Sequence, residues 1–239
     1  MAVTLSVVIP TLNEEVDLPN CLHSIKDLAD EIIIVDSGST DQTINIAQKH
    51  KTKIIYHPFK SFSDTRNLGN DIAKGSWILS LEADVSVPPE LVNEIKIAVQ
   101  NPTFDAYYIE RLNQIWGKEI MHTDWGPKDD CHIWLYKKDS GKWESDVHEE
   151  YKTSGRVGKL KNRLLHHNYD TISEFIDKTD RYSELAKNKG LSSNPLKALM
   201  DFIKRYLYKR GFLDGYHGLF LSYLQATYFL SLWVKNKTQ

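Results

Sequence analysis

An apolar run ends in two acidic residues, one position apart, at Leu79-Ser80-Leu81-Glu82-Ala83-Asp84-Val85. The run is typical of a buried β-strand. Because side chains alternate across a strand, Glu82 and Asp84 are expected on the same side of its carboxyl end. In a parallel α/β sheet ligands bind at that end, and two carboxylates suit a divalent cation that carries a diphosphate. Solvated acidic pairs are also common there, so the interpretation depends on the rest of the chain.

The segments before this run alternate between strand and helix patterns. Valine and isoleucine are concentrated in 5–10, 31–36 and 53–56, and apolar residues recur at helical spacing between them. Four such alternations predict an α/β fold, with a mostly parallel sheet flanked by helices and joined by right-handed crossovers. The carboxyl ends of neighbouring strands form one crevice in such a sheet, so Asp36 and Asp84 are expected at the same edge.

Length and composition describe an ordinary globular protein. The chain has 239 residues, a net charge of -2 and no Lys/Arg-rich arm, which argues against nucleic acid as a partner. Cys21 and Cys131 lie far apart without neighbouring metal ligands, so isolated thiols in a reducing compartment are expected. The first residues lack the pattern of a signal peptide, and we expect a cytoplasmic protein.

The turn after the first predicted strand argues against two common nucleotide-binding folds. Neither Gly-x-Gly-x-x-Gly nor Gly-x4-Gly-Lys-Ser/Thr follows residues 5–10, so NAD-binding Rossmann and P-loop interpretations lose their main support. Asp36 can instead accept hydrogen bonds from a base or a ribose, although an aspartate that caps a turn fits the same position.

Four motifs in the first ninety or so residues resemble those of the family-two inverting glycosyltransferases, which have the GT-A fold. They are Val8-Ile9-Pro10-Thr11-Leu12-Asn13-Glu14-Glu15, Ile34-Val35-Asp36-Ser37-Gly38-Ser39-Thr40-Asp41, Arg66-Asn67 and Leu81-Glu82-Ala83-Asp84. The resemblance implies that Asp36 contacts the base, usually uracil, that Arg66 lies near the diphosphate, and that Asp84 binds Mg²⁺ or Mn²⁺. The residues that it implies for nucleotide-sugar binding are Pro10, Thr11, Asn13, Glu14, Asp36, Ser37, Gly38, Arg66, Glu82 and Ala83. The family more often has aspartate at position 82, which leaves a ribose or metal contact by Glu82 open.

A cluster of candidate bases lies near residue 150. Inverting transfer needs a carboxylate that takes the proton of the acceptor hydroxyl, and by residue type Asp146, His148, Glu149 and Glu150 all qualify. The order Val-His-Glu resembles a subgroup that builds the lipopolysaccharide inner core. This resemblance favours Glu149 as the base and His148 as a neighbour on the acceptor side that positions substrate or phosphate.

Three other positions in the second half of the chain are compared with the subgroup or assigned a role. His166 resembles a histidine of the subgroup by its spacing within 164–169, and the resemblance implies that it reaches the metal or the diphosphate, although a lone histidine is more often structural. We favour a metal ligand, since imidazole is a competent ligand for Mn²⁺. The loop at 121–130 is aromatic, charged and turn-prone, and it could close over a sugar or be only a surface excursion. An acceptor role is favoured, with Trp125 on the acceptor side. The subgroup tends to carry an arginine at the position of Trp134, so no phosphate or acceptor contact is transferred to that residue.

Residues 171–239 are expected to form a helical extension of a catalytic domain at 1–170. Helical patterns cover 173–189 and 196–208, and in the second of these lysines and arginines surround one apolar side. That pattern is typical of a helix on a membrane surface, although an ordinary solvated helix also fits. Residues 215–234 contain no Lys, Arg, Asp or Glu, but polar side chains interrupt them. A helix at a membrane interface, or in a contact between two copies of the chain, is favoured there over a bilayer span.

These features predict a metal-dependent inverting glycosyltransferase that moves a hexose, with glucose favoured, from a UDP-sugar to a saccharide acceptor. The favoured acceptor is lipopolysaccharide core or another lipid-linked glycan, met at the inner face of the membrane, because the C-terminal helices are basic. One alternative keeps the fold but takes polyprenyl phosphate or a peptide side chain as acceptor. Another is a regulatory protein that binds a nucleotide sugar without turnover.

Overall fold

The computed structural model describes residues 5–145 and 149–238, and the chain divides into two compact units. The first unit consists of Met1–Arg111 and Cys131–His166, and the second of Leu112–Asp130 and His167–Gln239. Asp146 and His148, two of the candidate bases, lie outside the described residues.

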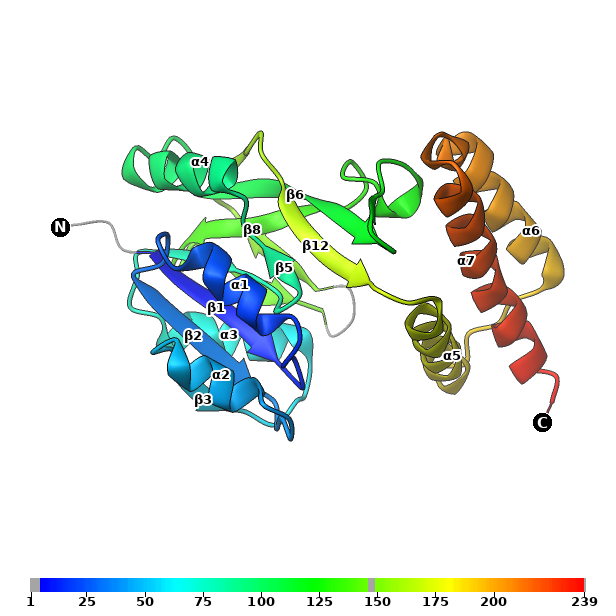
Figure 1. The fold of residues 1–239 in the computed structure, drawn as a ribbon, viewed down its shortest axis with the longest axis horizontal. Helices are drawn as coiled ribbons and strands as arrows, with labels where there is room; N and C mark the ends of the chain where they lie inside the picture. The colour runs from blue at the N-terminus through cyan, green and yellow to red at the C-terminus, as the bar shows by residue number, and fades with distance from the viewer. Residues whose placement is uncertain (1–4, 146–148, 239) are drawn as a thin grey trace. The chain divides into compact units, whose positions relative to one another are not determined.

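The first unit begins with a parallel sheet that has one helix in each crossover (Figure 1). Its strands follow the order β3-β2-β1-β4, and all three pairings are parallel. β1, β2 and β4 are apolar and largely buried, as expected for parallel strands covered on both faces, whereas the edge strand β3 is partly exposed. The predicted α/β alternation is therefore confirmed. The bounds are β1 Leu5–Thr11, α1 Leu18–Ile25, β2 Glu31–Asp36, α2 Thr43–Lys49, β3 Lys53–Tyr56, α3 Phe62–Ile72 and β4 Trp77–Ser80.

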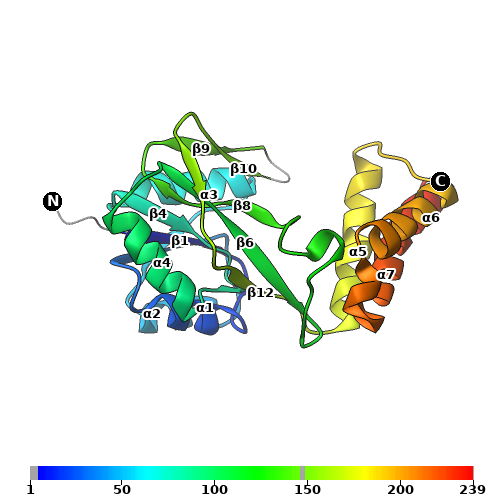
Figure 2. The same cartoon turned by 90° about the horizontal axis from the view of Figure 1, so that it is seen from above.

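Beyond β4 the sheet continues mainly with antiparallel pairs, a direction that hydrophobic patterns do not indicate. β4 pairs with β8, β8 with β6, and β12 with β5 in this sense, whereas the short β11 runs parallel to β6. A hairpin of β9 and β10 packs beside β8 (Figure 2). The bounds are β5 Val85–Ser86, α4 Pro89–Gln100, β6 Ala106–Ile115, β8 Cys131–Lys137, β9 Gly141–Glu144, β10 Glu150–Thr153, β11 Val157–Lys159 and β12 Leu164–Tyr169.

The acidic pair does not lie on a strand, and that prediction was wrong. β4 ends at Ser80, and Glu82 and Asp84 occupy the turn between β4 and β5. The Val85 N–H closes this turn by donating to the Glu82 carbonyl oxygen at 3.2 Å. The local turn, rather than strand alternation, therefore brings the two carboxylates together.

The second unit contains the helices predicted for the C-terminal part of the chain. α7 packs against both α5 and α6. Across the described residues, no helix combines the length and the apolar character needed to cross a membrane. A small apolar core in this unit is formed by Ile115, Ile120, Phe175, Leu221 and Leu224. The bounds are β7 Lys118–Glu119, η1 Thr123–Trp125, α5 Ile172–Asn188, α6 Pro195–Ile203, η2 Lys204–Tyr208, η3 Gly211–Asp214 and α7 Tyr216–Lys235.

Candidate active site

The residues predicted to border the nucleotide lie where β1 and β2 end side by side. Thr11 and Asp36 are paired in register at the last positions of these strands. Seven predicted residues belong to this edge or to the two loops that follow: Pro10, Thr11, Asn13, Glu14, Asp36, Ser37 and Gly38.

Hydrogen bonds tie the two loops to each other. The Asn13 N–H donates to Ser39 Oγ at 2.9 Å, and Asn13 Oδ1 accepts from the Thr40 N–H at 2.8 Å. The Glu14 N–H donates to Thr43 Oγ1 at 2.7 Å. Asn13 adopts a left-handed conformation with φ 58°, which asparagine tolerates well. Asn13 and Glu14 thus belong to two loops that are bonded together beyond the ends of β1 and β2, and their contact with a nucleotide stays a prediction.

Asp36 is buried and organises the second loop. Its Oδ2 accepts from the N–H groups of Gly38 at 2.9 Å and Ser39 at 3.0 Å, while Oδ1 accepts from the hydroxyls of Thr11 at 3.2 Å and Ser39 at 2.5 Å. Gly38 has φ +109°, a conformation that favours glycine. Both interpretations of Asp36 stay open, because the carboxylate caps the turn at the edge where a base is expected.

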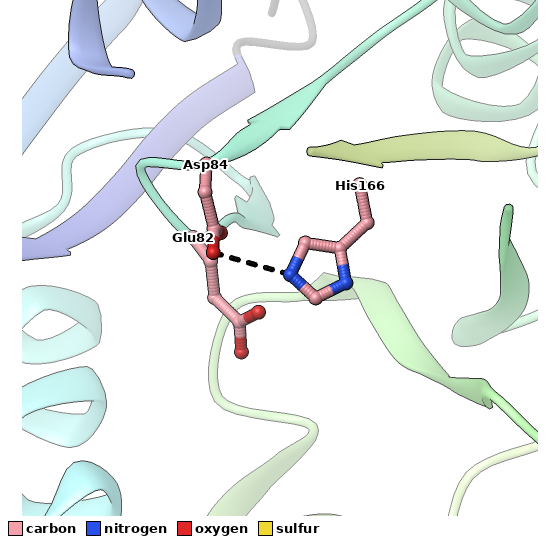
Figure 3. A group of neighbouring side chains, drawn as sticks. All are labelled: Glu82, Asp84 and His166. Atoms are coloured by element: carbon pink, nitrogen blue, oxygen red, sulfur yellow. Dashed lines mark hydrogen bonds and ion pairs between the residues drawn. The ribbon is translucent and has the colours of Figure 1, made fainter. Parts of the chain in front are cut away.

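Glu82, Asp84 and His166 form a group that could hold a metal ion (Figure 3). One potential ligand atom from each of the three residues lies within 4.8 Å of the others. His166 Nε2 lies 3.1 Å from Asp84 Oδ2. The pairing of β5 with β12 sets Val85 opposite His166, which explains how this histidine reaches the acidic turn. Carboxylate and imidazole groups together suit Mn²⁺ and similar divalent ions.

Apolar residues pack against the acidic turn. Ala83 is buried in the core, and the Cys21 Sγ lies 3.6 Å from the Glu82 carbonyl oxygen. Burial raises the pKa of the Cys21 thiol, and the charges of Asp84 and Glu14 raise it further. Cys21 is therefore an uncharged packing residue, as expected for an isolated thiol.

Arg66 lies inside the protein, only 1% exposed. Its Nη1 donates to Ser80 Oγ at 2.7 Å, its Nη2 donates to Glu82 Oε1 at 2.9 Å, and its Nε donates to Glu149 Oε1 at 3.3 Å. The guanidinium also lies over Trp143, 4.8 Å from the ring centroid. Arg66 therefore joins the acidic turn to the predicted base. Its contact with a diphosphate stays a prediction, and in this structure its partners belong to the protein.

Trp125 belongs to the second unit. Its carbonyl oxygen accepts from Asn113 Nδ2 at 2.9 Å, its ring packs against Phe175 at 5.8 Å, and the Arg205 guanidinium lies over it at 5.3 Å. These contacts describe a half-buried structural residue, and its role on the acceptor side stays a prediction.

Arg111 is a residue of the site that sequence reasoning missed. It lies on β6, its Nη1 forms an ion pair with Glu82 Oε2, and its guanidinium lies 5.1 Å from the ring centroid of Trp134. A single arginine in a strand carries no sequence signal, because its partners come from a distant turn and another strand. Trp134 was noted only for its departure from the subgroup.

Residues 6–151 match the model of glycosyl transferase family 2. The chain belongs to this family and is a glycosyltransferase. Among its relatives, the lipopolysaccharide core biosynthesis glycosyltransferase LpsC from Rhizobium meliloti (strain 1021) is 25% identical, over 93% of this chain and 90% of the relative. An uncharacterized glycosyltransferase from Rickettsia bellii (strain RML369-C) is also 25% identical, over 90% of this chain and 79% of the relative.

Solved glycosyltransferase structures share the fold. S. aureus TarS 1–349 in complex with UDP superposes with a TM-score of 0.51 at 15% identity, covering 88% of this chain and 72% of TarS. Glucosyl-3-phosphoglycerate synthase from Mycobacterium tuberculosis, in complex with Mn²⁺, UDP and phosphoglyceric acid, superposes with a TM-score of 0.50 at 14% identity, covering 81% of each chain. The predicted GT-A fold is confirmed.

Proposed function

We propose that this family-2 glycosyltransferase is metal-dependent and inverting, and that it moves a hexose, with glucose favoured, from a UDP-sugar to a saccharide. The observation that carries the proposal is one buried arginine, Arg66, that bonds both to Glu149 and to the acidic turn of Glu82 and Asp84. Transfer from a nucleoside diphosphate sugar requires a base and a metal site that lie near each other.

Asp84 and His166 would hold Mg²⁺ or Mn²⁺ in this proposal. When bound, the ion would neutralise the negative charge that develops on the leaving diphosphate. The loops after β1 and β2, with Asp36 at their base, would hold the uridine. Two solved structures with the same fold were determined with UDP, and one of them also with Mn²⁺.

Glu149 would take the proton of the acceptor hydroxyl. The acceptor oxygen then bonds to the anomeric carbon from one face, while the bond from that carbon to the diphosphate oxygen breaks on the other face. This displacement inverts the configuration of the sugar. Arg66 keeps the Glu149 carboxylate in place, because a charge-assisted hydrogen bond restricts its orientation.

The proposed acceptor is a saccharide carried by a membrane lipid, with lipopolysaccharide core favoured, and Trp125 and His148 are assigned to the acceptor side. The support is the 25% identity to LpsC and the surface of α6 and η2, where exposed apolar side chains lie beside the exposed Lys197 and Lys204. Such a surface suits an enzyme working at the inner face of the membrane. Polyprenyl phosphate or a peptide side chain is the alternative acceptor.

A UDP-release assay with Mn²⁺ over a panel of UDP-sugars tests the proposal, with core oligosaccharide as the acceptor. Transfer with inversion is expected, and Asp84→Asn should lower metal-dependent UDP binding by about tenfold or more. Asp71→Asn, on the exposed side of α3, is the matched control and should behave as wild type. Tight UDP binding without transfer or hydrolysis of any donor would instead indicate a regulatory protein.

A further inference from the structure

Glu82 is held by two arginines, one on each carboxylate oxygen. Arg66 Nη2 donates to Oε1 at 2.9 Å, and Arg111 Nη1 pairs with Oε2. Contacts between guanidinium and carboxylate are charge-assisted and fix the carboxylate in one orientation. Asp84, by contrast, faces His166. A divalent cation bound by Glu82 would have to share that carboxylate with two other positive groups, each of which repels it.

Two tryptophans keep the arginines in this arrangement. Trp134 lies against both guanidinium groups, with its ring centroid 5.2 Å from Arg66 Cζ and 5.1 Å from Arg111 Cζ. Trp143 covers Arg66 at 4.8 Å. Aromatic faces attract cations, and the negative charge of Glu82 offsets the repulsion between the two guanidinium groups. These contacts explain how two arginines can be packed beside one another around position 82.

Glu82 and Trp134 meet in this cluster, and each suits it better than the residue that the family resemblance leads one to expect there. Aspartate at position 82 would be one methylene shorter than Glu82 and would reach the two arginines less well. Arginine at position 134 would bring a third cation beside Arg66 and Arg111, where Trp134 provides an aromatic face instead. Glu82 and Trp134 therefore belong to one arrangement. The glutamate side chain, longer than aspartate, binds two arginines that both lie against the ring of Trp134.

We propose that Glu82 is a positioning residue and not a ligand of the metal. It fixes Arg66, and Arg66 in turn holds Glu149 through the 3.3 Å contact of Nε with Oε1. Since Arg66 is nearly inaccessible to solvent and also bonds to Ser80, its orientation depends on these few partners. The inference rests on the proposed function, in which Glu149 is the base and Asp84 holds the metal.

Calorimetric titration of Mn²⁺ into the protein saturated with UDP tests the first part without turnover. Glu82→Gln should keep the Mn²⁺ affinity within about threefold of wild type, whereas Asp84→Asn should lower it by about tenfold or more. An equal loss in the two variants would overturn the inference, because Glu82 would then act as a ligand. An unchanged affinity in Asp84→Asn would instead refute the metal centre of the proposed function.

Steady-state kinetics tests the effect on the base. Glu82→Gln should lower kcat by about tenfold or more with little change in the KM for the donor, because a misplaced base slows the chemical step. Glu82→Asp, which keeps the charge but shortens the reach, should recover part of kcat. Glu119→Gln, an exposed glutamate on β7, is the control. A change confined to KM would contradict a positioning role.

Thermal unfolding tests the contact between Glu82 and Arg111 whether or not a donor is turned over. The loss of Tm in the double variant Glu82→Gln/Arg111→Gln should be smaller than the sum of the two single losses, because either substitution already breaks the shared interaction. Additive losses would overturn the arrangement itself and would leave the proposed metal centre at Asp84 unaffected.

Discussion

Glu149 and Glu150 are neighbouring carboxylates with different surroundings. The Glu149 side chain is 14% exposed and contacts buried Arg66, whereas the Glu150 side chain is 57% exposed and pairs with Lys152 on the same strand. A hydrogen bond from Lys152 holds the pKa of the Glu150 carboxyl below its usual range. At the scale of single residues, the two glutamates therefore provide a matched pair of substitutions.

Substituting the predicted base should separate binding from chemistry. Glu149→Gln keeps the shape of the side chain but cannot accept the hydroxyl proton, so kcat should fall by about a hundredfold or more. UDP binding should stay close to wild type, as measured by titration, because the nucleotide loops are untouched. Glu150→Gln should change neither quantity. Near-normal turnover in Glu149→Gln would assign the base to another group.

At the scale of elements, α3 is the helix that carries Arg66 into the site. It packs closely on the parallel sheet at Gly69, where an added Cβ would lie 2.2 Å from Val8 Cγ1 and 3.3 Å from Val35 Cγ2. Ser61 caps the start of the helix by accepting from the Asp64 N–H at 3.1 Å. The position of Arg66 therefore depends on a glycine contact one helical turn further along.

Gly69→Ala tests this close packing. Alanine favours the helix, but its methyl group must displace Val8, so the free energy of unfolding should fall by about 1–3 kcal/mol. Urea denaturation of the variant measures the change. Asp71→Ala, on the exposed side of the same helix, gains helix propensity without a clash and should not destabilise the protein. Equal or greater stability in Gly69→Ala would show that α3 can move away from the sheet.

At the scale of the whole molecule, the second unit exposes an apolar face flanked by cations. We define the α6 face by its exposed apolar residues Leu199, Met200, Ile203 and Leu207 and by its exposed cations Lys197, Lys204 and Arg210. Asp201 is paired with Arg205 and Asp214 is buried, so the exposed charge of this segment is positive. Such a surface complements anionic lipids, in line with the membrane acceptor proposed above.

Vesicle sedimentation of the full chain tests the α6 face. We expect binding to vesicles that contain anionic phosphatidylglycerol and little binding to neutral ones, because each basic residue near an anionic surface contributes about 1 kcal/mol. Lys197→Glu/Lys204→Glu should abolish most of this binding. The control Lys26→Glu/Lys74→Glu makes the same change in net charge, but on the first unit, and should leave vesicle binding intact. Indifference to anionic lipid, together with a dimer in sedimentation velocity, would assign the face to a second copy of the chain.

Much of the parallel sheet and of the family assignment could be predicted from local sequence. The alternating apolar patterns predicted β1 to β4 and the helices between them, and the resemblance of four motifs to family-two glycosyltransferases predicted the family that residues 6–151 match. The resemblance to the subgroup implied His166 as a metal ligand. Its Nε2 lies 3.1 Å from Asp84 Oδ2, and its binding of a metal stays a prediction. The fold and family predictions succeed because they depend on residues that are neighbours in the chain, or on motifs whose order is kept along it.

Contacts between distant segments could not be predicted in the same way. The sequence indicated that Glu82 and Asp84 belong to one acidic site, but it predicted a strand where the chain turns. It gave no sign of Arg111, because the ion pair with Glu82 links residues that lie 29 positions apart. Strand register and side-chain packing bring Arg66, Arg111 and Trp134 around Glu82 only in the folded protein. The sequence therefore identifies the acidic pair, and tertiary structure distinguishes the carboxylate facing His166 from the carboxylate held by two arginines.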